Sequence, residues 1–213
     1  MIILTAGHTG TGTGAQCVTT QFDEGSETIW LRNRVAEILT NKYGLVVLMD
    51  NDTASLQLLT QTMQNAKCKM HNCPHPTNSP LKKYNETSEA SKNDCELCIV
   101  NCAFLIDLHF NAHTNPNARG TETIVSDDAT ELELRMASRL AHATADSLDI
   151  PLRGIKSESE TPHRRLAMLH LTPQSIILEV CFCTSPEDVE MYRKHRRKIA
   201  STIAKTIAEL VTF

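Results

Sequence analysis

Ionisable side chains stand in or directly after three apolar segments of the sequence. His8 follows IILTAG, His109 lies in FLIDLHFNA, and Glu179 lies in SIILEV. In folds that alternate strands with helices, functional groups gather where strands end and loops begin. Two histidines and one carboxylate are the protein ligands of a typical catalytic zinc, which keeps its fourth position for water. His8 and His109 are therefore candidate zinc ligands.

The segment around His109 places polar groups at every second position. In a strand, Asp107, His109 and Asn111 share one face, and the apolar side chains between them point to the other face. A polar row in an otherwise apolar strand needs hydrogen-bond partners or a cavity. We therefore expect a site on this face of the strand.

Several carboxylates are candidates for the third protein ligand of the zinc. Glu179 stands among apolar neighbours, where a charge is costly unless it is paired, lies near a metal or has a shifted pKa. The nearest carboxylates after His8 are Asp23, Glu24 and Glu27, at the start of a predicted helix. The residue types alone do not choose among these three.

The pattern around these residues predicts a single-domain α/β fold. Short apolar runs indicate strands, and apolar residues at helical spacing indicate helices. Their alternation predicts a mixed, mostly parallel central sheet flanked by helices. The expected strands cover about 1–8, 45–50, 102–110, 120–126 and 175–182, and the expected helices cover about 26–42, 55–66, 131–148 and 187–210.

Composition excludes several classes of partner. The 213 residues carry 21 Lys and Arg against 25 Asp and Glu, so the net charge of −4 does not favour nucleic acid. Only 4% of residues are aromatic, and no apolar run approaches the length of a membrane span. The chain starts without the features of a secretory signal. We therefore expect synthesis in the cytoplasm, reduced thiols and no membrane insertion.

One segment differs in composition from the rest of the chain. Residues 67–93 are rich in Pro, Asn and Ser, which predicts an insertion within the single domain 1–213. Cysteines cluster in and after it, with His71 and His75 nearby. The spacing is compatible with a second, structural zinc, and free thiols on a loop are the alternative. The candidate ligands are Cys68, Cys73, Cys95 and Cys98.

Several blocks of the sequence occur in the order of a known family. They read TAGHTGTGTGA, DEGSETIWLRNRVAEIL, IDLHFNA, RGTET, LRGIK and ILEVCFCTSPEDVEMYR. The chain resembles the zinc-dependent N-acetylmuramoyl-L-alanine amidases of the amidase-3 type, including phage endolysins. The resemblance covers nearly the whole chain outside residues 67–93. The family usually has Ser where this chain has Asp107.

The resemblance implies a reaction and roles for particular residues. It implies that His8, Glu24 and His109 bind zinc, with Glu27 as the alternative to Glu24, and that Glu179 is the catalytic carboxylate. Such an enzyme cuts peptidoglycan between N-acetylmuramic acid and the L-alanine of the stem peptide. It would act on the cell wall after release from the cytoplasm. Asn111 and Arg153 are candidates for contacting the substrate.

Three other interpretations stay open at this stage. Strand alternation sets Cys181 on the face of Glu179, which raises the possibility of a thiol-dependent wall hydrolase. A non-catalytic, zinc-stabilised wall-binding module is a second alternative. The basic run RKHRRK at 193–198 is typical of a solvated helix face, although it could hold an anionic polymer. The glycines around Gly12 lack the spacing of a phosphate-binding loop and instead indicate tight turning near the metal site.

Overall fold

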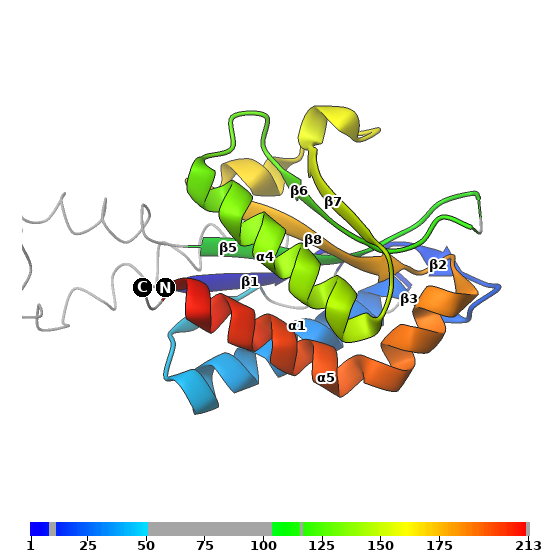
Figure 1. The fold of residues 1–213 in the computed structure, drawn as a ribbon, viewed down its shortest axis with the longest axis horizontal. Coiled ribbons are helices and arrows are strands. Elements are labelled where there is room, and N and C mark those ends of the chain that lie inside the picture. Colours follow the sequence, from blue (N-terminus) through cyan, green and yellow to red (C-terminus); the bar gives the residue numbers. More distant parts are fainter. Residues whose placement is uncertain (9–11, 51–103, 116, 212–213) are drawn as a thin grey trace, which may run out of the picture.

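The computed structural model describes a six-stranded sheet within residues 1–8, 12–50, 104–115 and 117–211. Figure 1 shows the sheet as the centre of the molecule. In spatial order the strands are β4 (Val47–Met49), β1 (Ile2–Ala6), β5 (Phe104–Asn111), β8 (Gln174–Phe182), β6 (Thr121–Val125) and β7 (Leu152–Ser157).

The predicted mixed, mostly parallel sheet is confirmed. β1 pairs in parallel with β4 and β5, β5 pairs in parallel with β8, and β6 pairs in parallel with β7. Among the described strands of this sheet, β6 and β8 form the one antiparallel pair. Strands buried on both faces read as continuous apolar runs, which explains why β1 was visible in the sequence as IILTA.

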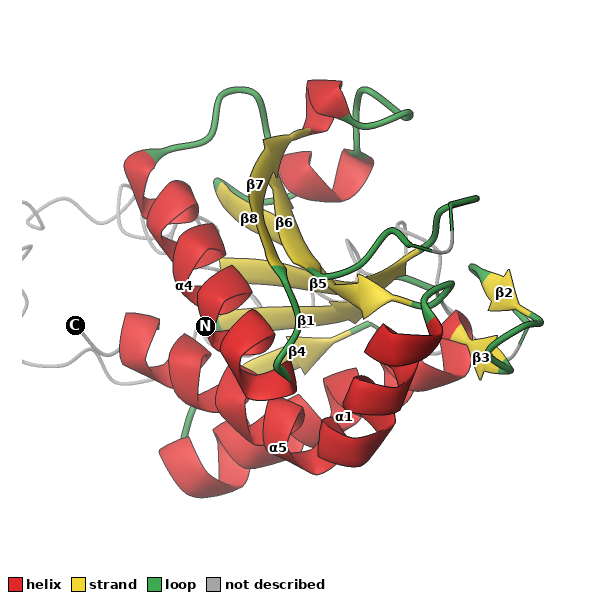
Figure 2. Cartoon of the chain, turned by 45° about the vertical axis from the view of Figure 1, so that its right-hand side comes forward, coloured by secondary structure: helices red, strands yellow, loops and turns green. Residues whose placement is uncertain are grey.

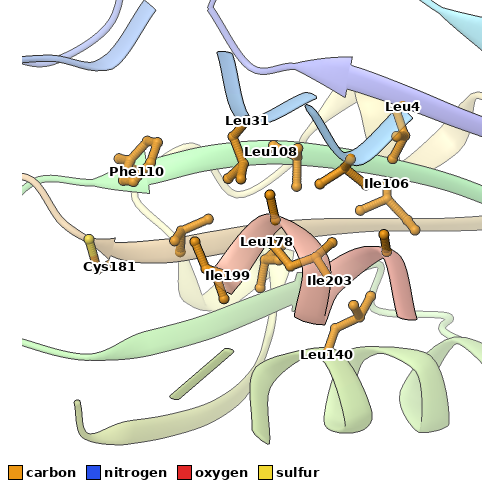
Figure 3. Close-up of a cluster of buried hydrophobic side chains, with 14 of the residues drawn as sticks. Leu4, Leu31, Ile106, Leu108, Phe110, Leu140, Leu178, Cys181, Ile199 and Ile203 are labelled. Carbon is orange, nitrogen blue, oxygen red and sulfur yellow. The ribbon is translucent and has the colours of Figure 1, made fainter. Parts of the chain in front are cut away.

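Three long helices cover one face of the sheet (Figures 1 and 2). The main hydrophobic cluster joins helix residues such as Leu31, Leu140 and Ile203 to strand residues such as Leu108 and Leu178 (Figure 3). The helices match the sequence prediction in number within this part of the chain and closely in extent. They are α1 (Glu24–Tyr43), α4 (Glu131–Leu148) and α5 (Pro186–Val211).

The ends of two helices follow from local chemistry. Gly44 adopts a left-handed conformation after α1, and its N–H bonds the carbonyl oxygens of Leu39 and Thr40. Thr130 and Glu133 form a reciprocal capping box at the start of α4. None of the helices in the described ranges combines the length and apolar character that a bilayer crossing requires.

The described residues cover only part of the opposite face of the sheet. Two short 3₁₀ segments, η2 (Glu158–Glu160) and η3 (Ala167–His170), lie on this side (Figure 2). Met168 of η3 packs with Ile3 and Leu105, which belong to a small separate cluster. Side chains further along the same face of these strands, beyond this cluster, are polar. The fold thus leaves one end of this face for the site.

Two parts of the fold were not predicted. β7 has the sequence LRGIKS. Its polar residues and its glycine interrupt the apolar run that is typical of a strand. The two-stranded hairpin of β2 (Gln16–Cys17) and β3 (Phe22–Asp23) has strands too short to show alternation. The expected helix at 55–66 and the insertion at 67–93 lie outside the described residues.

The small hairpin carries a disulfide between Cys17 and Cys183. The expectation of reduced thiols is therefore wrong for this pair, and Cys181 is the free cysteine within the described ranges. The hairpin lies against the end of β8, where Thr20 Oγ1 donates a hydrogen bond to the carbonyl oxygen of Cys183 at 2.7 Å. Two cysteines 166 residues apart thus meet because the tertiary fold brings the hairpin to that strand end.

Breaking this disulfide should destabilise the fold. The bond closes a long loop, so its loss releases conformational entropy in the unfolded chain. We expect the double variant Cys17→Ala/Cys183→Ala to lose about 2–4 kcal/mol in free energy of unfolding. Urea denaturation with and without reductant measures the loss. Reductant should leave the double variant unaffected, and equal wild-type stability in both conditions would show that the pair contributes nothing.

Candidate metal centre

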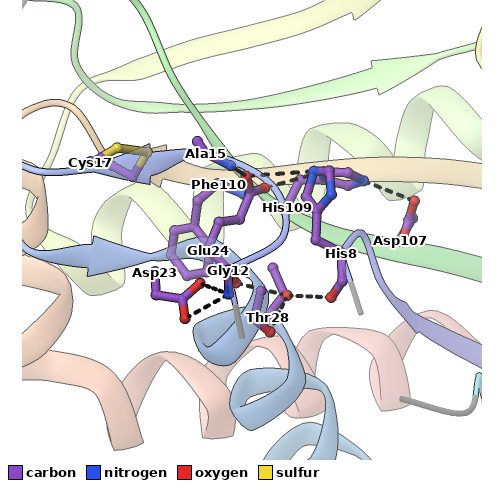
Figure 4. A network of polar contacts seen from close by, with 12 residues as sticks. His8, Gly12, Ala15, Cys17, Asp23, Glu24, Thr28, Asp107, His109 and Phe110 are labelled. Atoms are coloured by element: carbon purple, nitrogen blue, oxygen red, sulfur yellow. Dashed lines mark hydrogen bonds and ion pairs between the residues drawn. A yellow bond between two sulfur atoms is a disulfide. The ribbon is translucent and has the colours of Figure 1, made fainter. Parts of the chain in front are cut away.

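Three side chains from separate parts of the chain converge at the ends of β1 and β5. One ligand atom from each of His8, Glu24 and His109 lies within 4.8 Å of the others. His8 Nε2 is 3.6 Å from Glu24 Oε2, and His109 Nδ1 is 3.3 Å from Glu24 Oε1 (Figure 4). The two imidazole rings meet edge to face, with centroids 5.1 Å apart. We call these three residues the metal group: they could hold a metal ion, and two imidazoles with a carboxylate are ligands that zinc accepts.

The fold holds the Glu24 carboxylate in one orientation. Its Oε2 accepts a hydrogen bond from the backbone N–H of Ala15 at 2.8 Å, and its Oε1 accepts one from Phe110 at 2.9 Å. Burial raises the pKa of Glu24, but hydrogen bonds from His109, Ala15 and Phe110 outweigh that effect and lower it below the ordinary value. The carboxylate is therefore ionised and aimed at both histidines (Figure 4).

Asp107 orients the ring of His109. Its Oδ2 lies 3.1 Å from His109 Nε2, and its Oδ1 accepts a hydrogen bond from Thr5 Oγ1 at 2.7 Å. With its Nε2 on Asp107, the His109 ring presents its other nitrogen, Nδ1, to Glu24. Burial lowers the pKa of His109, but Asp107 and Glu24 raise it well above its ordinary value. Carboxylates that fix a ligand histidine in this way raise its basicity as a metal ligand.

Two glycines make room for the histidines. A Cβ at Gly7 would overlap the imidazole of His109, and Gly7 was not singled out from the sequence. Gly14 has φ +73°, and a Cβ there would lie 2.7 Å from Glu24 Oε2 and also crowd His8. Gly14 therefore satisfies both the backbone and the space requirements of the site. This agrees with the predicted tight turn around it.

Glu179 lies beside the metal group on the next strand. The parallel register of β5 and β8 pairs it with His109, so both side chains point to the same face. Its Oε2 is buried without a hydrogen-bond partner among the described residues. Burial raises the pKa of Glu179 to about 7; the charge of His109 opposes this rise, and nearby carboxylates, chiefly Glu24, add to it. A carboxylate with this pKa can accept and release a proton near neutral pH.

The two candidate substrate contacts, Asn111 on β5 and Arg153 on β7, both bind Glu122 of β6. Asn111 Nδ2 donates to Glu122 Oε1 at 2.7 Å, and Arg153 Nε donates to Glu122 Oε2 at 2.5 Å. The antiparallel register of β6 and β8 pairs Glu122 directly with Glu179. Glu122 was missed in the sequence, although a carboxylate within TETIV is the same signal that singled out Glu179.

Glu27 lies away from the metal group, although it shares the first turn of α1 with Glu24. Its Oε2 accepts a hydrogen bond from Tyr192 at 3.1 Å and pairs with Arg196 at 2.8 Å. Arg196 also stacks on Trp30, and Arg193 of the same basic run donates to backbone oxygens near the hairpin. These members of the run 193–198 therefore hold the fold together.

The expectation that Cys181 shares the face of Glu179 is wrong. The register of β5 and β8 shifts between His109 and Asn111, so that Asn111 pairs with Phe182. This irregularity breaks the alternation, and Cys181 joins the main hydrophobic cluster, fully buried. Figure 3 shows it among those apolar side chains. Burial raises the pKa of the thiol well above its ordinary value, which suppresses the reactive thiolate.

The proposed ligands of a second metal cannot be placed. Cys68, Cys73, Cys95 and Cys98 lie outside the described residues, so the structural zinc remains a prediction from spacing.

Comparison with known proteins identifies the family. The family model for N-acetylmuramoyl-L-alanine amidase (Amidase_3) matches residues 2–209. The chain belongs to this family. No curated protein sequence matches the chain.

Several solved structures share the fold. An N-acetylmuramoyl-L-alanine amidase from Clostridium difficile 630 is 19% identical with a TM-score of 0.62, covering 99% of this chain and 94% of that chain. The catalytic domain of the CD27L endolysin targeting Clostridia difficile is 24% identical with a TM-score of 0.56, covering 99% and 96%. Cwp6 from Clostridium difficile is 18% identical with a TM-score of 0.69, and the chain spans 29% of its length. This amidase-3 chain therefore has the architecture of its family.

Proposed function

We propose that this amidase is zinc-dependent and cuts the amide bond between N-acetylmuramic acid and the L-alanine of the stem peptide. The convergence of His8, Glu24 and His109, within 4.8 Å of one another, carries the proposal. Glu179 Oε2, which has no hydrogen-bond partner in the described part of the chain, supports it, because a buried oxygen of this kind fits a site that a reactant completes. Family membership supplies the substrate class.

The residues divide the reaction between them. When bound, zinc lowers the pKa of water toward neutrality and polarises the scissile carbonyl. Glu179 accepts a proton from the attacking water as the new C–O bond forms, and it then donates this proton to the leaving nitrogen as the C–N bond breaks. The products are a lactyl carboxylate on the sugar and a free amino group on L-alanine. Glu24 and Asp107 hold the two histidines in place during these steps.

The biological setting is proposed on the same basis. Peptidoglycan is the macromolecular partner, and the enzyme is of the endolysin type, made in the cytoplasm and acting on the wall after release. The likeness to the CD27L endolysin catalytic domain agrees with this setting.

Digestion of purified sacculi tests the bond that is cut. Mass spectrometry should detect new free amino termini of L-alanine after incubation with the enzyme. A chelator should abolish their release and added zinc should restore it, whereas a thiol alkylator should have no effect. New reducing sugars in place of new L-alanine amino termini would show that the enzyme is a glycosidase. Binding to walls without any release would identify the non-catalytic module, and loss of activity with the alkylator alone would favour the thiol mechanism.

A further inference from the structure

A buried carboxylate outside the metal group, Glu122 of β6, gathers polar side chains from two other strands, β5 and β7. Glu122 is 3% exposed and accepts from Asn111 at one oxygen, as described above. Its other oxygen binds both Arg153 Nε at 2.5 Å and Lys156 Nζ at 2.8 Å. Burial raises the pKa of Glu122, but Lys156 and Arg153 outweigh that effect and lower it. Glu122 is therefore ionised.

The two cations exceed the charge of the carboxylate that holds them. Within the described ranges, Glu122 is the only carboxylate that forms an ion pair with Arg153 or Lys156. Among the described residues, the two cations thus share a single ion-paired carboxylate. The two cationic side chains remain 35% and 34% exposed, so a ligand can reach them.

The guanidinium of Arg153 is held in place by further contacts. It lies over the ring of Phe182 with its central carbon 4.9 Å from the ring centroid. Its Nη1 donates to the carbonyl oxygen of Arg119 at 3.4 Å. A cation fixed in this way loses little rotamer freedom when it binds an anion. This arrangement is typical of a preorganised site and differs from that of a mobile surface arginine.

The cationic pair lies in line with the metal group. Residue pairing runs from His109 to Glu179, then to Glu122 and then to Gly154, across four adjacent strands. Adjacent strands are about 4.8 Å apart, so Glu122 is about 10 Å along the sheet from His109. A peptide spans at most about 3.3–3.6 Å per residue, so this distance corresponds to about three residues. A Cβ at Gly154 would meet nothing within 4 Å, so the row ends in open space beside Arg153.

We propose that Arg153 and Lys156, held by Glu122, bind a free carboxylate within the first three residues of the stem peptide. This proposal rests on the amidase reaction proposed above. It assigns substrate contact to Lys156 as well as Arg153. Asn111 and Glu122 are positioning residues, because Glu122 binds both cations and Asn111 binds the other oxygen of Glu122.

Kinetics on paired soluble substrates test the proposal. The substrates are muramoyl tripeptides with free stem carboxylates and matched peptides in which each carboxylate in turn is a carboxamide. We expect Lys156→Met to raise KM for the free-acid substrate about fivefold to tenfold, with a smaller effect on kcat. For the carboxamide that removes the bound anion, wild type and variant should have the same KM, because the two changes remove one interaction. Arg153→Met should behave in the same way.

Controls separate this result from misfolding and from failure of the reaction itself. Lys205→Met on α5 removes an exposed cation and should leave KM unchanged. Metal content and thermal midpoint report whether each variant is intact. The proposal is overturned if KM is unchanged on the free-acid substrate, or if the variants raise KM equally on every carboxamide. Wild-type protein that hydrolyses none of the peptides or sacculi would instead reject the proposed amidase function.

Discussion

Glu179→Gln should lower kcat for wall hydrolysis by about 10²–10⁴-fold while the protein keeps its zinc. Glutamine has nearly the same shape, but its amide oxygen cannot take the proton of the attacking water. Burial raises the pKa of Glu179 to about 7. The glutamine variant keeps this buried environment and removes only the group that takes up the proton. The rate of release of L-alanine amino termini measures the effect, and zinc content is determined on the same sample.

A matched carboxylate elsewhere provides the control for this variant. Glu190 is exposed on α5, and Glu190→Gln should retain wild-type turnover. If Glu179→Gln keeps full activity, Glu179 is not the proton-transfer group. If it loses both zinc and activity, its role is to support the metal site.

Glu24→Gln should remove the bound zinc and, with it, the activity. The substitution takes away the only negative charge among the three proposed ligands, and it also weakens the hydrogen bonds from the N–H groups of Ala15 and Phe110. Substitution of a residue that only supports a metal ligand lowers metal affinity by about 10–100-fold. Loss of a ligand should therefore lower it by more than about 100-fold. Zinc titration followed by calorimetry, together with metal analysis after dialysis, measures the change.

Glu27 is the matched control for Glu24. Both lie in the first turn of α1, but the Glu27 carboxylate contacts Tyr192 and Arg196. Glu27→Gln should therefore keep its zinc and most of its activity. The opposite result, with zinc lost from the Glu27 variant and kept by the Glu24 variant, would exchange the two assignments.

Local patterns in the sequence were sufficient for most of the secondary structure. Short apolar runs predicted β1, β4, β5, β6 and β8, and helical spacing predicted α1, α4 and α5, because apolar side chains of these elements pack into the core. β7 escaped because it has few buried apolar residues. The residue types also singled out His8, His109 and Glu179 as costly groups in apolar surroundings.

Long-range contacts decided the details of the site. The residue types did not choose between Glu24 and Glu27, and the family resemblance favoured Glu24; in the structure Glu24, and not Glu27, lies with the two histidines. The disulfide between Cys17 and Cys183 depends on where the small hairpin meets β8. Burial of Cys181 depends on a register shift that no pattern of residue types reveals.

Local patterns of residues set which segments are strands or helices and which polar groups stand inside them, because burial of apolar side chains imposes local periodicity. Which of those groups meet depends on the long-range pairing of the strands. Strand order and register set the row from His109 through Glu179 to Glu122. These pairings join residues up to 70 positions apart along the chain, and hydrophobic periodicity within a segment carries no information about its neighbours in the sheet.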